Sequence, residues 1–591
     1  MEARETTLDQ ILSGTQQYII PVFQRDYEWG KDRWTTLWDD IISIFDEYEN
    51  NLTHFIGPIV VISKALPYEY PIHLVVDGQQ RLITTFVILS AMRERARSLG
   101  LVTLADSIYR NSLAFYHTDG NYVHKIKPRI RDRDTLSNII SNNIRSLDIN
   151  SLVTQAYNYF SKEIENLSPL QQSLFSDDTP DKILTRLYQT IIHRLLTVTI
   201  TLGNRDNPSN IFESLNFKYE TLADSDLIRN YIFMQMPLSE QDNFNNTVWG
   251  SFEEMFNQIG LEDKKTKEHI TNFFYRYLIS RKTYFPRKSL YPEFTKYIDE
   301  KLEEDGDIIQ LVNELKQFAR YYIEITHKGS AVQELESAFE RFRNLEVETA
   351  IPLVLCIFEL YDNENISIST FQNMLRLIES FILRRSILRQ RTRGYGLDFA
   401  LAKENIESLD TLINYFISKG WPEDDEVKDK LSEFPIYHHE KNKCLLILQE
   451  IERSFGHKEK VQLADTTIEH VLPQNLNFHW RHMLGSDIAD EVHSKYLHTL
   501  GNLTLTGYNS ELGDRPYEDK REYFSRSNLS LNRYFSSKEK WTKEEILERG
   551  KYLSDIFVQI WIRPQTNKHS LKEKPKKKRV NTEVKPTKRL I

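Results

Sequence analysis

The first 235 residues alternate between short apolar runs of strand length and longer segments with helical spacing of apolar residues. Short runs rich in Val, Ile and Phe are typical of strands, whereas apolar positions three and four apart are typical of helices. The strand-like runs are Tyr18–Phe23, Phe55–Ser63, His73–Val76 and Leu196–Leu202. This mixture predicts an α+β domain over residues 1–235.

From residue 236 to residue 455 the pattern is almost wholly helical. Three segments space their apolar residues three and four apart: FFYRYLISR, DIIQLVNELKQFARYYIEI and FQNMLRLIESFILRRSILRQ. Gly and Pro are sparse in this region, and no repeat of fixed period is visible, so a solenoid is not expected. The pattern predicts an all-α middle domain.

After residue 456 two strand-like runs precede a helix. TTIEHVLPQN is followed by a helical insert, then by LHTLGNLTLTGYN and by the helical RPYEDKREYF. The order strand, strand, helix predicts a third domain over residues 456–565.

The composition is that of an ordinary globular protein, with 40% hydrophobic and 27% charged residues among 591. Cys356 and Cys444 are the two cysteines, which excludes a disulfide framework and a Cys-x-x-Cys zinc site. MEARETTLDQ does not resemble a signal peptide, and no apolar run approaches the roughly 20 residues of a membrane span. We therefore expect a cytoplasmic protein without a membrane partner.

The net charge of −9 is unevenly distributed. The last 26 residues carry ten Lys and Arg against two Glu, which leaves 66 basic and 83 acidic residues in the preceding part. A chain body that is this acidic cannot attract nucleic acid as a whole, so any contact must be a local patch or the tail. We expect residues 566–591 to be a basic disordered tail; nuclear import through PKKKRV is the alternative.

Glu469 and His470 stand at the end of the first strand of the third domain. A neutral imidazole can take a proton from water, and a metal held by a carboxylate stabilises charge on a phosphate. Asn509, after the second strand, offers an amide oxygen of the kind that suits Mg²⁺. Asn502 precedes that strand, so two amides flank it. The sequence therefore indicates a metal-dependent hydrolytic site.

IEHVLPQN…LGNLTLTGYNSEL…RPYEDK resembles the HNH, or ββα-metal, nuclease module at the C-terminus of GmrSD-type type IV restriction enzymes. The resemblance implies that His470 is the general base and that Glu469 and Asn509 are ligands for Mg²⁺ or Mn²⁺. It also implies that Asn502 is the amide that braces the hairpin and that Lys520 is a further lysine of the catalytic site. This chain has Gly513-Asp514 where the family usually has Ser-Asn, so the role of that corner stays open.

Four histidines lie in the insert between the two strands: His479, His482, His493 and His498. Their spacings of 3, 11 and 5 do not place them on one helical face. A structural zinc site is therefore not expected, and an additional contact to DNA is left open.

In the first domain, VVDGQQR joins a strand to a helix. The first N–H groups of that helix, and its dipole, point toward Gly78 and form an anion site. Arg81 adds a fork for phosphate oxygens, and Gln79 and Gln80 can bridge sugar or base edges. The chain has no G-x-x-x-x-G-K-[ST], so it is not a P-loop NTPase.

PVFQRDYEW holds a second Gln-Arg pair beside Tyr27 and Trp29, whose rings can stack on a base. Together with VVDGQQRLITT and IFESLN…L…DLIRN, it resembles the ParB/sulfiredoxin-like nucleotide-binding domain that forms the other half of GmrSD-type enzymes. The resemblance implies that this domain binds and hydrolyses a nucleoside triphosphate and couples this to DNA cleavage. The positions that carry over are Gln24, Arg25, Asp77, Gly78, Gln79, Gln80 and Arg81. Phe217-Lys218-Tyr219 stands where the family often shows Gly-Gly, so contacts by that loop stay open.

Arginines crowd the end of a helix and the following loop of the middle domain: Arg384, Arg385, Arg389, Arg391 and Arg393. A solvated helix end favours cations, which is one interpretation. The other is a DNA-binding patch of Arg385, Arg389 and Arg391 that contacts phosphates.

The two resemblances imply a single-chain, BrxU-like form of the family: a nucleotide-regulated, metal-dependent endonuclease that cuts double-stranded modified DNA of phages. A homodimer is left open. The alternatives are a sensor that binds modified DNA without cleaving it, and an RNase effector. The expected domains are the nucleotide-binding domain (1–235), a helical linking domain (236–455), the nuclease domain (456–565) and the tail (566–591).

Overall fold

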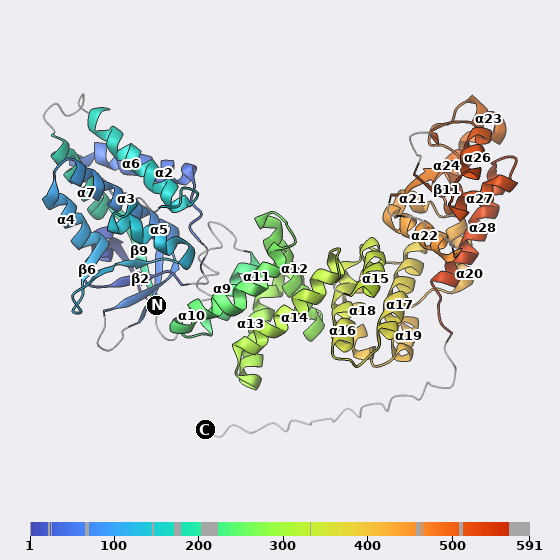
Figure 1. The fold of residues 1–591 in the computed structure, drawn as a ribbon, viewed down its shortest axis with the longest axis horizontal. Coiled ribbons are helices and arrows are strands. Elements are labelled where there is room, and N and C mark those ends of the chain that lie inside the picture. Colours follow the sequence, from blue (N-terminus) through green and yellow to red (C-terminus); the bar gives the residue numbers. More distant parts are fainter. Residues whose placement is uncertain are drawn as a thin grey trace, which may run out of the picture. The chain divides into compact units, whose positions relative to one another are not determined.

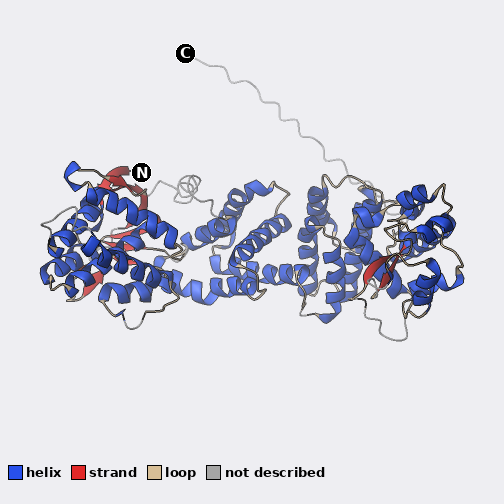
Figure 2. Ribbon diagram, turned by 90° about the horizontal axis from the view of Figure 1, so that it is seen from above, coloured by secondary structure: helices blue, strands red, loops and turns tan. Residues whose placement is uncertain are grey.

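The computed structural model of the protein is drawn as a ribbon in Figure 1. It divides into two compact units. Unit 1 comprises Met1–Tyr275 and Pro286–Gln317, and unit 2 comprises Arg276–Phe285 and Phe318–Ile591. The structure describes residues 2–21, 24, 26–64, 70–144, 147–170, 179–202, 223–330, 332–456, 463, 465–507 and 512–565. Among the described residues, the strands form a large sheet and a small hairpin in unit 1 and a two-stranded hairpin in unit 2 (Figure 2).

Unit 1 is built on a seven-stranded mixed sheet of order β1-β9-β4-β5-β2-β8, with β3 paired to β9. Its strands are β1 (Glu2–Thr7), β2 (Gln17–Ile19), β3 (His54–Phe55), β4 (Ile59–Lys64), β5 (Ile72–Asp77), β8 (Ile126–Lys127) and β9 (Leu195–Leu202). The inner strand β5 pairs antiparallel with β4 and parallel with β2. A separate hairpin joins β6 (Ala114–Tyr116) to β7 (Tyr122–His124).

Each of the four predicted strand-like runs overlaps a strand: Tyr18–Phe23 overlaps β2, which ends at Ile19, and the others overlap β3 and β4, β5, and β9. The sequence analysis predicted no strand over β1, which pairs antiparallel with β9 along its whole length. The segment EARETT is polar and mostly exposed at the sheet edge. A strand of this kind lacks the apolar alternation on which prediction depends.

The central helix of unit 1 is α3 (Gln79–Ser98), which begins directly after β5. Fifteen of its twenty residues are buried, so the helix has no wide solvent face, and other helices enclose it. It packs against α4, α5, α6 and α7, and α2 packs against α7 (Figure 1). These helices are α2 (Lys31–Asp46), α4 (Val102–Ile108), α5 (Ile130–Ser141), α6 (Leu152–Leu170) and α7 (Pro180–Arg194).

Buried aromatic rings pack among the helices between residues 224 and 326. Trp249, Phe252, Phe256 and Phe273 are buried there and contact one another in sequence. The helices are α9 (Asp224–Met234), α10 (Leu238–Phe244), α11 (Gly250–Asn257), α12 (Asp263–Arg281), α13 (Leu290–Asp305) and α14 (Ile308–Thr326). No helix in the described part of the chain is long and apolar enough to cross a membrane.

Between residues 236 and 455 the described residues form helices and turns without a strand, as predicted. The helices of this part of unit 2 are α15 (Gln333–Asn344), α16 (Ile351–Asp362), α17 (Ile368–Ile387), α18 (Tyr395–Ala402), α19 (Leu409–Ser418), α20 (Asp424–Glu433), α21 (Ile436–His439) and α22 (Lys441–Ser454). Cys356 and Cys444 are buried and free.

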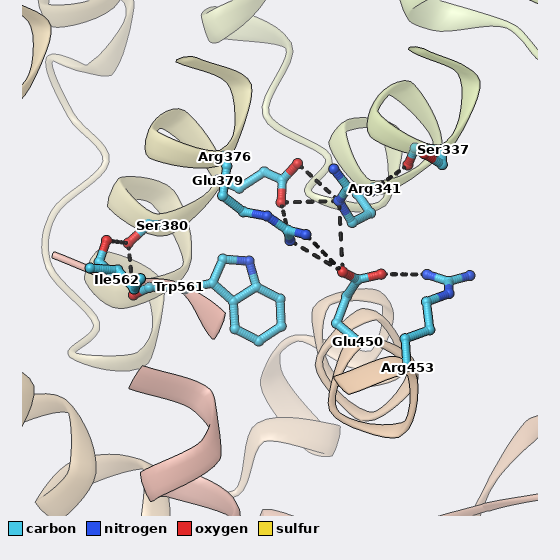
Figure 3. Close-up of polar contacts among 9 residues, drawn as sticks. All are labelled: Ser337, Arg341, Arg376, Glu379, Ser380, Glu450, Arg453, Trp561 and Ile562. Carbon is cyan, nitrogen blue, oxygen red and sulfur yellow. Dashed lines mark hydrogen bonds and ion pairs between the residues drawn. The ribbon is translucent and has the colours of Figure 1, made fainter. Parts of the chain in front are cut away.

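A buried ionic network ties α15, α17 and α22 together (Figure 3). Glu379 is fully buried, and both its carboxylate oxygens lie within 3.3 Å of the Arg341 guanidinium. Arg376 bridges Glu379 at 3.0 Å and Glu450 at 3.1 Å, so two carboxylates share two guanidinium groups. Burial raises the pKa of Glu379, and the two arginines oppose that shift.

The C-terminal part of unit 2 shows the predicted order strand, strand, helix in β10 (Thr467–His470), β11 (Leu503–Thr506) and α26 (Tyr517–Ser525). β10 and β11 pair antiparallel, with His470 opposite Leu503. The insert between them contains α23 (Phe478–Leu484), α24 (Ala489–Tyr496) and the turn η9 (Leu500–Asn502), and α27 (Ser530–Arg533) and α28 (Lys543–Ile560) follow α26.

We expect Glu379→Gln to destabilise the protein by about 3 kcal/mol, because removing one member of a buried ionic group leaves its partners without compensation. Urea unfolding of the full chain measures this loss. The matched control is Glu348→Gln, whose carboxylate is 69% exposed and pairs with Arg276 at 2.9 Å. A surface pair of this kind contributes about 0–1 kcal/mol. Equal losses in both variants would contradict a stabilising role for the network.

Candidate functional site

The hairpin of unit 2 is braced by the side chain of Asn502, which is fully buried. Its Nδ2 donates to the carbonyl oxygens of Leu472 and Leu497, at 3.0 and 2.9 Å. Its Oδ1 accepts from the Leu472 N–H at 2.7 Å and from Trp541 Nε1 at 3.0 Å. All four hydrogen-bonding positions of the amide are therefore occupied within the protein. The residue can hold the hairpin but has no position left for a substrate.

Lys520 reaches from α26 to the end of β10. Its fully buried ammonium donates to Glu469 Oε1 at 2.7 Å and to the carbonyl oxygen of His470 at 2.8 Å. Burial lowers the pKa of Lys520 and raises the pKa of Glu469, and the ion pair opposes both shifts. The pair fixes the last two residues of β10 against α26.

The start of β11 is fixed against α28 by Gly501 and Arg549. A Cβ atom at Gly501 would lie 2.1 Å from the carbonyl oxygen of Ile546, so the helix backbone passes too close for any other residue. The buried Arg549 donates to the carbonyl oxygens of Gly501 and Leu503 at 2.8 and 2.6 Å. Each of the two strands is therefore held by a buried cation, and both cations act at the same end of the pair, where His470 lies opposite Leu503.

His470 is 4% exposed, and its Nε2 lies 3.1 Å from His498 Nδ1. The Tyr437 ring meets it edge-on at 4.6 Å between centroids and stacks on His498 at 5.5 Å. Burial, followed by the charges of His498 and Lys520, lowers the pKa of His470 to about 3. The imidazole is thus neutral at ordinary pH and oriented by His498.

Glu469 and His470 leave the strand on opposite faces, because successive side chains of a strand alternate. Glu469 contacts Lys520, and His470 contacts His498. Asn509 lies outside the described residues. Among the residues that are described, no three His, Cys, Asp or Glu side chains form a group able to hold a metal ion.

The histidines of the insert do not gather at one point. His479 and His482 are exposed on α23, and His493 bonds to the carbonyl oxygen of Pro473 at 2.9 Å. Only His498, among the four, contacts His470 directly. The sequence analysis missed this partnership because the two residues are 28 positions apart, on either side of the insert.

In unit 1 two of the amides singled out from the sequence, those of Gln24 and Gln80, make hydrogen bonds within the protein. Gln80 Oε1 accepts from the Glu28 N–H at 2.9 Å, and its Nε2 donates to the Asp26 carbonyl at 2.9 Å. Gln24 Nε2 donates to the Val76 carbonyl at 2.8 Å. Gln79 is 5% exposed at the start of α3, after Gly78. Arg25 and the loop with Phe217-Lys218-Tyr219 lie outside the described residues.

Asp77 and Arg81 line a cavity of about 320 Å³. One face of α2 and one face of α3 bound it, together with β3 and the start of β9. Its charged and polar lining includes Arg33 and an Asp40–His54 pair with 3.3 Å between Oδ2 and Nε2. Its remaining walls are largely apolar, with Trp29 on the lining. The cavity thus offers two guanidinium groups for phosphate oxygens, two carboxylates that balance their charge, and a large ring with apolar walls for a flat ring of a ligand.

The sequence analysis did not identify three of the lining residues: Arg33, Asp40 and His54. Arg33 and Asp40 stand seven positions apart on α2, so they share a face, but nothing local indicates that this face meets β3. The pairing of β3 with β9, which is far along the chain, brings His54 to the cavity.

Arg81 is held in the cavity by the backbone beneath it. Its Nη1 donates to the Pro58 carbonyl at 2.6 Å. Gly57 has a φ of +105°, and a Cβ atom there would lie 2.7 Å from Arg81 Nε. Glycine at this position therefore gives the guanidinium the space that it occupies.

The three arginines predicted to bind DNA differ in their surroundings. Arg385 donates to the carbonyl oxygens of Lys419 and Arg391 and lies over the Tyr395 ring, 5.2 Å from its centroid. Arg389 and Arg391 are exposed. Arg385 therefore holds the loop, whereas Arg389 and Arg391 present their side chains at the surface.

We expect Gly57→Ala to destabilise the protein more than Gly14→Ala, by about 1 kcal/mol. Both glycines have positive φ, but nothing lies within 4 Å of a Cβ atom at Gly14. Both variants carry the strain of the left-handed region, and only Gly57→Ala also displaces Arg81 from its hydrogen bond. Urea unfolding measures both losses. In an Arg81→Ala background the difference should vanish; equal losses in the wild-type background would refute the contact.

Two family models match this chain. Residues 8–233 match the N-terminal domain of GmrSD restriction endonucleases, and residues 421–556 match the C-terminal domain of GmrSD restriction endonucleases. A comparison with curated proteins finds no match. The second match begins at residue 421, so it includes α21 and α22 as well as the β10–β11 hairpin. The chain belongs to the GmrSD restriction endonuclease family and carries the N-terminal and C-terminal domains of that family in a single polypeptide.

Proposed function

We propose that this member of a type IV restriction family cleaves modified, double-stranded phage DNA by metal-dependent hydrolysis at His470, under the control of a nucleoside triphosphate. The observation that carries the proposal is the buried, neutral imidazole at the end of a strand that Lys520 and Asn502 fix in place. The proposal includes the BrxU-like form and the ββα-metal identity of β10, β11 and α26.

His470 acts as the general base in this proposal. Its Nε2 bonds to His498, which leaves Nδ1 to accept a proton from the attacking water. The water oxygen forms a bond to phosphorus, and the bond from phosphorus to the leaving oxygen breaks. The negative charge of a bound phosphodiester raises the pKa of His470 from about 3 toward its ordinary value, which strengthens the base.

Glu469 and Asn509 are the proposed ligands of Mg²⁺ or Mn²⁺. The Lys520 bond occupies one oxygen of the Glu469 carboxylate, which has about four acceptor positions and so retains capacity for a cation. Burial raises the pKa of this carboxyl, and a neighbouring divalent cation would favour its charged form. One or two protein ligands are enough for Mg²⁺, because the ion keeps several water ligands and also binds the phosphates of the substrate. When bound, the ion supplies positive charge to the phosphate.

The cavity of unit 1 is the proposed site for the nucleoside triphosphate, in a domain of ParB/sulfiredoxin-like type that also hydrolyses it. Arg81 and Arg33 supply forks for phosphate oxygens, and Trp29 supplies a ring for the base. Asp77 offers a carboxylate for the Mg²⁺ that accompanies a triphosphate. Gln24 and Gln80 support this site through their hydrogen bonds to the backbone, and Gln79 begins α3 directly after Gly78.

Of the arginines in the middle of the chain, we propose that Arg389 and Arg391 contact DNA directly. Arg385 contributes by holding the loop that carries them. The tail, residues 566–591, lies outside the described residues and adds non-specific attraction that salt screens.

We expect His470→Ala to slow cleavage of a modified DNA duplex by ~10²–10⁴-fold, because the reaction loses its general base. The variant should still fold, as shown by a single cooperative unfolding transition. Excess EDTA should stop cleavage by the wild type, and Mg²⁺ or Mn²⁺ should restore it. His479→Ala, which removes an exposed imidazole of the same domain, is the control. Wild-type cleavage rates in His470→Ala would refute the assignment.

We expect Arg81→Ala and Asp77→Ala to weaken binding of a nucleoside triphosphate by about tenfold or more, since each removes a charge-assisted contact. Calorimetry on the full chain measures this, and Arg4→Ala is the control because Arg4 is exposed on the edge strand. Should all three variants bind like the wild type, the nucleotide site lies elsewhere.

A further inference from the structure

A row of imidazole rings leads from His470 to the surface of unit 2. His498 lies beside His470, and the His438 ring stacks on His498 with centroids 5.8 Å apart. His439 follows, with its ring 5.0 Å from that of His438. His438 and His439 are exposed on the short helix α21. The row is therefore buried at one end and open to solvent at the other.

The open end of the row borders a cavity of about 250 Å³ formed by the end of α17, the start of α18 and the start of α22. His439 and Arg389 both line it. Desolvation and the nearby charge of Arg389 lower the pKa of His439. The effect of Arg389 agrees with its position beside His439 in the lining of this cavity. The cationic side chain of Arg389 thus lies next to the open end of the row of rings.

Arg389 is suited to an outside ligand. It is exposed, and its guanidinium makes no hydrogen bond or ion pair with another residue in the described ranges. Its φ of +51° is an uncommon conformation for a residue other than glycine, and such strain gathers at functional sites. The neighbouring Arg385, by contrast, is engaged with backbone carbonyls.

The charges around this cavity favour an anion. Glu440 is the carboxylate among the described lining residues, and it is already bonded to Lys443 at 2.6 Å and to Ser386 at 3.0 Å. Lys441 lies over the Tyr437 ring, 5.5 Å from its centroid, and so adds a further cation near the row. Each imidazole has at least one ring N–H, which can donate a hydrogen bond to a phosphate oxygen.

We propose that Arg389, His439, His438 and His498 form a phosphate track, a binding site for the sugar–phosphate backbone of the DNA strand that is cut at His470. This inference rests on the proposed nuclease function. In it, Arg389 pairs with a phosphate away from the cut, and His438 and His439 donate hydrogen bonds to phosphates between that position and the scissile one. The track fixes the strand so that the scissile phosphate reaches the general base.

The test uses the full chain in EDTA, which prevents cleavage, and an unmodified DNA duplex as the probe of backbone binding. The double variant His438→Ala with His439→Ala should weaken binding by about tenfold. Arg389→Ala should lower the slope of log affinity against log salt by about one, as expected for one lost phosphate contact. The control double variant, His479→Ala with His482→Ala, removes two exposed imidazoles from the same domain and should bind like the wild type.

Cleavage of a modified duplex provides the second measurement. The track variants should raise KM and approach the wild-type rate at saturating DNA, because His470 is intact. A wild type that neither binds the duplex nor cleaves the modified one with Mg²⁺ would overturn the nuclease proposal, and the track with it. A wild type that binds, with the His438 and His439 double variant and Arg389→Ala binding equally well, would overturn the track alone.

Discussion

The buried ammonium of Lys520 is the interaction on which the C-terminal site depends. A fully buried lysine is stable only when it is paired, and this one bonds both the Glu469 carboxylate and the carbonyl oxygen of His470. The end of β10 therefore cannot move without leaving a charge uncompensated. Asn502 and Arg549 hold the neighbouring strand by the same means, a buried polar group whose bonds go to backbone. Together they fix the position from which His470 projects.

The same principle operates in unit 1 with a different outcome. Gln24 donates to the Val76 carbonyl at the end of β5, and Gln80, at the start of α3, accepts from the Glu28 N–H. Gly57 leaves space for Arg81. Groups that make many internal hydrogen bonds build the frame, and groups with few of them face the cavity. This division separates supporting residues from binding residues in both units, and it also separates Arg385 from Arg389.

Much of the fold followed from the sequence, because apolar spacing records burial directly. The order strand, strand, helix was readable from IEHVLPQN, LGNLTLT and RPYEDK, whereas the exposed edge strand β1 had no apolar alternation to reveal it. For the site, the residue types indicated the chemistry, but they did not indicate which way each side chain points or which residues it contacts. The sequence cannot show that the Gln80 amide turns inward, or that a 28-residue separation closes to bring His498 to His470. Those facts come from tertiary packing, which local patterns do not encode.

Chemical rescue of His470→Gly tests the central claim most directly. Glycine removes the imidazole and leaves space for a free one beside the fixed end of β10. The account predicts that this variant is nearly inactive on modified DNA with Mg²⁺, and that added imidazole restores cleavage in proportion to its concentration, up to saturation. Cleavage by His470→Gly at the wild-type rate without imidazole would contradict the account, because the proton would then be taken by another group.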